Sequence, residues 1–143
     1  MPRQRMRNDE WIFGSNCFVC ETSNDAGLRI PFWYDDESEE VDGEFVLDDR
    51  FSGAPSYVHG GVTLAILYEA QAWATIAVSL KFAATTETAT KFLRPVLVGR
   101  DHAGFLREAR CGGAERLRFE GPGDLHVVGH RICGECAGRN RRE

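Results

Sequence analysis

The chain has 143 residues, of which 43% are hydrophobic and 27% are charged, so it is long enough to bury one hydrophobic core without disulfides or metals. Its formal net charge of −5 argues against non-specific nucleic-acid binding, which requires a basic surface. The N-terminal residues contain no apolar segment of the signal-peptide kind, and we therefore expect a soluble, cytoplasmic protein that does not associate with a membrane.

One domain is expected at 17–138, preceded by a polar arm at 1–16 and followed by a charged tail at 139–143. Within the domain, short runs bounded by turn-forming residues predict two strands before a long helix and up to four after it. These predicted strands are 28–33, 41–47, 86–98, 105–110, 116–120 and 125–137. A single helix with strands on both sides of it in the sequence indicates an α+β protein in which an antiparallel sheet covers the helix.

The cysteines form two C-x-x-C pairs, and a fifth cysteine is unpaired in this pattern: Cys17 and Cys20, Cys133 and Cys136, and Cys111. Two such pairs are the ligand set of a tetrahedral zinc site, but 112 residues separate them, far more than in the usual zinc ribbon. An odd number of cysteines without a secretion signal favours reduced thiols. We therefore expect no metal and no other cofactor, and rank a zinc-bound interaction module as a distant alternative.

The predicted helix, 62–80, is apolar on nearly all sides, which is typical of a buried helix. Glu69 is the only charged residue in this segment, and a buried carboxylate is costly unless it has a partner or a chemical task. A sheet of the predicted size covers only part of so apolar a helix. We therefore expect a second copy of the chain to cover the remainder.

The tetrapeptide Val58-His59-Gly60-Gly61 leads directly into this helix. Two glycines allow another molecule to approach the backbone closely, and the first N–H groups of a helix have no partner within it. The helix dipole adds partial positive charge at the same end. The sequence therefore predicts an element that stabilises negative charge, on the same helix as a desolvated acid.

Several motifs in this order resemble the PaaI-like branch of the hotdog-fold acyl-CoA thioesterases. They are Cys17-x-x-Cys20, Gly27-Leu28, Gly53-x-Pro55-x-x-Val58-His59-Gly60-Gly61, Thr85, and Phe92-x-Arg94-Pro95-Val96. The resemblance covers about residues 17–100. It implies a long central helix wrapped by a curved antiparallel sheet, assembly into homodimers or homotetramers, and hydrolysis of coenzyme A or acyl-carrier-protein thioesters at the dimer interface.

The resemblance also implies roles for individual residues. The backbone N–H of Gly60, assisted by Gly61, would polarise the thioester carbonyl, and His59 would orient the group or its loop. Thr85 lies where the family often has a hydroxyl residue near the water or the acid. Two cations on the strand that leaves the site, Lys91 and Arg94, would meet the phosphates of a coenzyme A arm.

The chain departs from the family at the acid. The family's catalytic acid lies nine residues after the histidine, where this chain has Tyr68, and only the neighbouring Glu69 is acidic. The branch that uses an asparagine six residues before the histidine is not matched either, because Gly53 occupies that position. Since successive helix positions point about 100° apart, Glu69 is not a simple replacement for a residue at position 68.

Three readings follow from this departure. In the favoured one, Glu69 is the base that activates water or attacks the thioester, and the protein is an acyl-CoA thioesterase. In the second, Tyr68 enters the site as a donor or a plug, and the protein mainly binds acyl thioesters. In the third, the scaffold serves a different acyl-thioester reaction.

Overall fold

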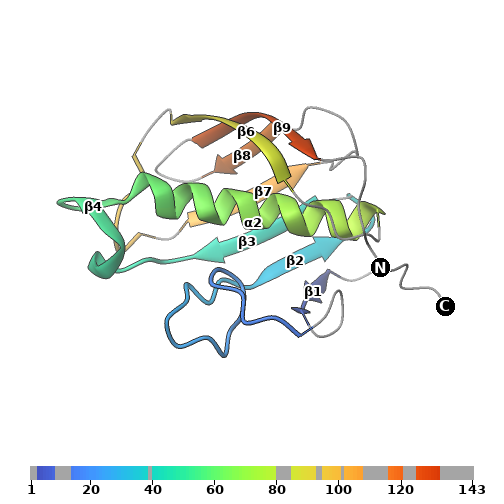
Figure 1. The fold of residues 1–143 in the computed structure, drawn as a ribbon, viewed down its shortest axis with the longest axis horizontal. Helices are drawn as coiled ribbons and strands as arrows, with labels where there is room; N and C mark the ends of the chain where they lie inside the picture. The colour runs from blue at the N-terminus through green and yellow to red at the C-terminus, as the bar shows by residue number, and fades with distance from the viewer. Residues whose placement is uncertain are drawn as a thin grey trace.

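The computed structural model describes residues 3–8, 14–38, 40–79, 85–92, 95–100, 102–107, 116–120 and 125–132. It contains one long helix, α2 (Gly60–Ser79), packed on a seven-stranded antiparallel sheet (Figure 1). The predicted α+β class, with one helix on an antiparallel sheet, is confirmed.

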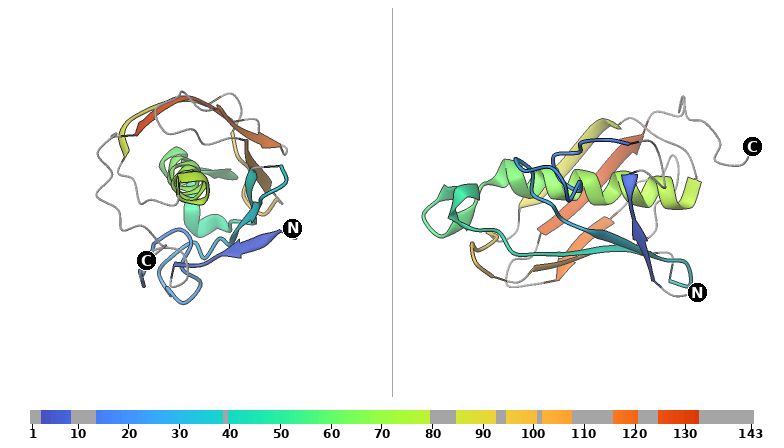
Figure 2. Two further views of the ribbon diagram at one scale, coloured as in Figure 1. Left: turned by 90° about the vertical axis from the view of Figure 1, so that its right-hand side faces the viewer. Right: turned by 90° about the horizontal axis from the view of Figure 1, so that it is seen from below.

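The sheet has the strand order β1-β2-β3-β7-β8-β9-β6. Its strands are β1 (Gln4–Met6), β2 (Phe32–Asp35), β3 (Glu40–Phe45), β6 (Thr85–Phe92), β7 (His102–Arg107), β8 (Arg116–Glu120) and β9 (Leu125–Ile132). Seen along α2, the strands lie above and to the right of the helix, and the segment that precedes β2 lies below it (Figure 2). The helix is therefore contacted on two sides, by the sheet and by the segment that precedes β2, which we call the N-terminal segment.

The core lies between α2 and the sheet. In β3, alternate residues Val41, Gly43 and Phe45 are buried whereas Glu44 is exposed, as expected when one face of a strand packs on a helix. The largest fully buried side chains belong mostly to α2: Trp73, Ile66, Leu67, Gln71 and Val41. No helix in the described part of the chain is long and apolar enough to cross a membrane.

Three predicted features differ from the structure. The strand predicted at 28–33 begins only at Phe32, because Arg29 has a φ of 57°, which an extended strand does not accommodate. Gln4–Met6, predicted as part of a polar arm, pairs with β2 as a strand of the sheet. The strand predicted at 86–98 is β6, which ends at Phe92. Residues 133–137 of the last predicted strand lie outside the described residues.

A short hairpin precedes α2, where no strand was predicted from the sequence. It comprises β4 (Ser52–Ala54) and β5 (Tyr57–Val58), which follow a 3-10 turn, η1 (Asp49–Phe51). The Asp48 side chain caps this turn by accepting the Arg50 N–H at 3.0 Å. Because β5 leads straight into α2, the hairpin determines where the helix begins (Figure 1).

Candidate active site

His59 caps the N-terminus of α2 with its own imidazole. Its carbonyl accepts the first helical hydrogen bonds, from the N–H groups of Val62 at 3.0 Å and Thr63 at 3.1 Å. Its Nδ1 accepts the Gly61 N–H at 2.9 Å, which is the interaction that Ser, Asp or Asn makes at most helix N-termini. The His59 side chain therefore bonds to the turn at the start of its own helix.

Gly60 supplies the remaining donor at this end of the helix. Among the described residues, no acceptor is found for its N–H, whereas the Gly61 N–H is used by His59. Gly60 is exposed, and a Cβ built on it would lie 3.7 Å from the Phe92 ring. The Phe92 side chain is itself 54% exposed. This N–H lies beside an aromatic ring, at the positive end of a helix. It can therefore donate a hydrogen bond to an oxygen atom of a ligand whose apolar part contacts the ring.

Two other glycines are required by the position of His59. A Cβ on Gly53 would lie 2.9 Å from the His59 Cα and 3.1 Å from its Cδ2. A Cβ on Gly61 would lie 3.1 Å from His59 Nδ1. Gly53 therefore allows β4 to pass directly against His59, a contact that was not predicted from the sequence.

Glu69 lies further along α2, where the N-terminal segment crosses the helix. The carboxylate is half-buried, and its Oε1 accepts a hydrogen bond from the Cys17 thiol at 3.2 Å. The Cys20 N–H donates to Cys17 Sγ at 3.4 Å. The two sulfur atoms and a carboxylate oxygen all lie within 4.8 Å of one another. The contact of this cysteine pair with Glu69 was not predicted from the sequence.

The two thiols have different acidities. A hydrogen bond from the Cys20 side chain, together with backbone N–H groups, lowers the pKa of Cys17 although burial opposes this. The pKa of Cys20 is raised by its hydrogen bond to Cys17, then by burial and by the negative charge of Glu69. Cys17 is therefore the thiol that ionises first, and a second negative charge in the cluster is strongly disfavoured.

Tyr68 points away from this cluster. Its side chain is 43% exposed, and it belongs to a stripe along α2 whose members are all exposed or partly exposed. The other members of the stripe are spaced three or four residues apart: Gly61, Leu64 and Ala72. Tyr68 and Glu69 thus differ in surroundings, since the Glu69 carboxylate accepts a hydrogen bond from Cys17 whereas the Tyr68 side chain is largely exposed.

A single chain does not bring all the predicted site residues together. Nine helical residues place Gly60 and Glu69 roughly 13 Å apart along the axis of α2. Thr85 begins β6 and Phe92 ends it beside Gly60, so Thr85 is roughly 23 Å from that end. The backbone of Lys91 lies in β6 next to Phe92, whereas Arg94 lies outside the described residues.

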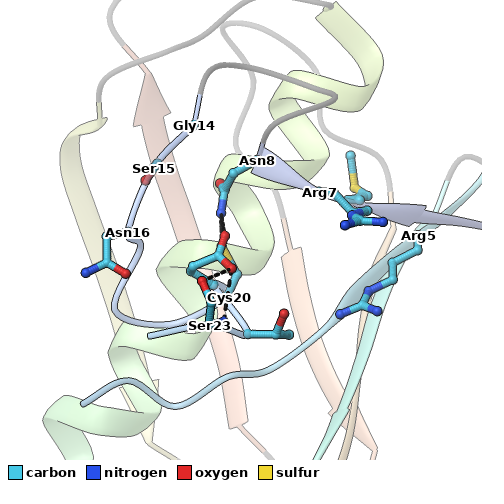
Figure 3. A pocket seen from close by; sticks show the side chains of 11 residues that line it. Arg5, Arg7, Asn8, Gly14, Ser15, Asn16, Cys20 and Ser23 are labelled. Carbon is cyan, nitrogen blue, oxygen red and sulfur yellow. Dashed lines mark hydrogen bonds between the residues drawn. The ribbon is translucent and has the colours of Figure 1, made fainter. Parts of the chain in front are cut away.

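A cavity of about 350 Å³ is lined by residues 5–8, 14–16 and 20–23 (Figure 3). Cys20 lines it together with residues of β1 and of the loop before β2, among them Arg5, Arg7, Asn8 and Ser15. Asn8 is 6% exposed, and its Nδ2 lies 3.6 Å from Cys20 Sγ and 3.1 Å from Glu21 Oε2. Cys20 is therefore the member of the cysteine cluster that borders this cavity.

No protein-family model and no curated protein sequence matches the chain. Solved structures do match it. A thioesterase superfamily protein has a TM-score of 0.67 and 19% identity, with 79% of this chain and 60% of that chain covered. The PaaI protein of the E. coli phenylacetic acid degradation operon has a TM-score of 0.54 and 15% identity, with 64% and 73% covered.

An acyl-CoA hydrolase from Staphylococcus aureus, solved with butyryl coenzyme A, coenzyme A and coenzyme A disulfide, is also similar. It has a TM-score of 0.56 and 13% identity, with 73% of this chain and 71% of that chain covered. Identities this low establish the fold alone. The predicted resemblance to PaaI-like proteins is confirmed at that level.

Proposed function

From the fold that the chain shares with thioesterase superfamily structures, we propose that it hydrolyses acyl thioesters of coenzyme A or of an acyl carrier protein. The observation that carries this proposal is the Gly60 N–H, an exposed donor at the start of a buried helix for which the described residues offer no acceptor. It suits the oxyanion that forms when a thioester carbonyl is attacked.

In the proposed reaction the Gly60 N–H binds the carbonyl oxygen, and Glu69 removes a proton from a water molecule. The water oxygen bonds to the carbonyl carbon, the carbon–sulfur bond breaks, and the proton goes to the departing thiolate. His59 holds the Gly60–Gly61 turn. Thr85 orients the water or the acid, and the cations Lys91 and Arg94 bind the phosphates of the coenzyme A arm.

The proposal needs two copies of the chain. One carbonyl group must be within hydrogen-bonding reach of Gly60 and a few ångströms from the water at Glu69, yet about 13 Å of helix separates the two in one chain. Two helices packed antiparallel about a two-fold axis place Gly60 of one copy opposite Glu69 of the other. This dimer of hotdog folds would cover the part of α2 around Leu64, midway between Gly60 and Glu69.

The first test is a panel of acyl coenzyme A substrates: short-chain, long-chain, phenylacetyl and hydroxybenzoyl. We expect at least one to release free thiol, followed with a thiol-reactive dye, at a rate proportional to enzyme concentration. The turnover number should fall on dilution below the dimer dissociation constant, because each site needs both copies. Failure to hydrolyse any member, in protein that is folded and dimeric, would contradict the proposal.

The exposure of Tyr68 favours a second candidate, a protein that binds acyl thioesters and hydrolyses them poorly. A phenol at the family's acid position, on the open side of α2, is placed to contact a substrate without activating water. The variant Tyr68→Asp separates the candidates. If Glu69 is the base, this variant gains no more than a few-fold in kcat over the wild type, and Tyr68→Asn serves as its uncharged control.

A sharp rise in kcat for Tyr68→Asp but not for Tyr68→Asn would assign the native protein to the binding class. In that case acyl coenzyme A should raise the melting temperature of the wild-type protein without being consumed.

A further inference from the structure

We propose that Cys17, Cys20 and Glu69 form a site for a divalent metal ion of the zinc class, with three protein ligands and an open fourth position. In the sequence, the second C-x-x-C pair is too distant to complete the usual zinc ribbon. In the structure, the third ligand is instead a carboxylate on α2.

The geometry of the cluster supports this assignment. The two sulfur atoms and the Glu69 oxygen lie within 4.8 Å of one another, and Cys17 Sγ is 3.2 Å from Glu69 Oε1. Tetrahedral zinc with sulfur at about 2.3 Å and oxygen at about 2.0 Å separates its ligand atoms by roughly 3.5–3.8 Å. Small side-chain rotations are therefore enough to surround an ion.

The cysteine pair is held in one conformation by its own backbone. The Cys20 N–H donates to Cys17 Sγ, and the Glu21 N–H donates to the Cys17 carbonyl at 3.2 Å, so residues 17–21 form a compact turn. An N–H group directed at sulfur stabilises a thiolate, the form of cysteine that binds metals. The other cysteine, Cys20, accepts a hydrogen bond at its Sγ from Nδ2 of the buried Asn8. Residues that bind a metal are commonly oriented by such hydrogen bonds from neighbouring side chains.

The charges of the cluster also favour a cation. Two thiols and a carboxylate lie together in a half-buried place. A divalent ion bound there would take thiolate and carboxylate ligands, and its charge would offset two of their negative charges. Cys20, one of the three ligands, lines the cavity of about 350 Å³, so an ion can approach the site from that side (Figure 3).

One consequence rests on the proposed function. If Glu69 is the base for hydrolysis, its carboxylate cannot coordinate the metal and accept a proton from water at the same time. Metal binding and thioester hydrolysis therefore exclude each other, and a bound ion would keep the enzyme inactive.

Cobalt(II) titration of the full chain, reduced and freed of metal with a chelator, tests the site. We expect one Co²⁺ per chain, with the near-ultraviolet absorption of thiolate-to-cobalt charge transfer and the strong visible bands of a tetrahedral site, and displacement by Zn²⁺. Cys20→Ser should weaken binding at least ~100-fold, since a ligand matters more than an outer partner, whose loss costs about 10- to 100-fold. Glu69→Gln should weaken binding and shift the visible bands while the charge transfer remains.

Cys133→Ser is the matched control, because it removes one thiol from the other C-x-x-C pair, and it should bind Co²⁺ as the wild type does. The proposal is overturned if the reduced wild type shows no charge-transfer band, if Cys20→Ser binds with unchanged affinity, or if Cys133→Ser loses binding as well. Circular dichroism shows whether each variant is folded. If Cys20→Ser is unfolded, Cys20→Ala is measured in its place. Hydrolysis by the metal-free protein is measured separately, so the two proposals fail independently.

Discussion

Replacing Glu69 by glutamine lowers kcat for thioester hydrolysis at least ~10²-fold, the loss expected when a general base is removed. Glutamine keeps the size of the side chain and can still accept a hydrogen bond from the Cys17 thiol, so the turn above α2 is retained. What it loses is the ability to accept a proton from water. KM should change much less than kcat, because the Gly60 N–H that binds the carbonyl is untouched.

Glu44→Gln is the matched control for this experiment. Glu44 is an exposed glutamate of β3, outside the proposed site, and the substitution makes the same change of charge. Both variants are assayed in the presence of a chelator, so that no metal competes for Glu69. If Glu69→Gln turned over at the rate of Glu44→Gln, Glu69 would not be the base.

Replacing Gly53 by alanine lowers the stability of the protein by about 1–3 kcal/mol, the usual cost of overpacking a tight contact. The new Cβ would stand 2.9 Å from the His59 Cα, a backbone atom that moves only if the start of α2 moves. The His59 Nδ1 cap on Gly61 shifts with it, and so does the Gly60 N–H. We therefore expect kcat to fall together with the melting temperature.

Gly14→Ala tests whether this effect belongs to the site. A Cβ at Gly14 meets no atom within 4 Å, so the same substitution there should leave the urea midpoint and kcat near the wild-type values. Equal behaviour of Gly14→Ala and Gly53→Ala, at one protein concentration, would show that the contact with His59 has no energetic importance.

The helix and its glycine-rich start were predictable because their signals are local. A segment that is apolar on all sides, from Val62 onward, has no alternative to burial, and glycines before it provide room at the N-terminus. The structure begins α2 at Gly60, two residues before the predicted start. The strands with clear boundaries, such as Arg116–Glu120, were predicted for the same reason.

The surroundings of Glu69 were not predictable in this way. Cys17 and Glu69 are 52 residues apart in the sequence, and no periodicity relates a turn to a position on a helix. Their contact exists because the segment before β2 crosses α2 on the side that the sheet leaves uncovered (Figure 2). The hairpin at β4–β5 was missed because its strands are too short to show alternation. The need for glycine at position 53 follows from its contact with His59, which only the structure shows.

The sequence by itself determined the α+β class, the buried helix and the turn at its start that carries free N–H donors. Hydrophobic periodicity and glycine affect the conformation of the residues next to them in the chain, so their effects can be predicted locally. The tertiary structure alone decided that His59 caps its own helix, that Tyr68 lies on the open side, and that Glu69 meets two thiols. These outcomes depend on which segments pack together. Which segments pack together depends on how the whole chain buries its apolar residues, and no local sequence pattern contains that information.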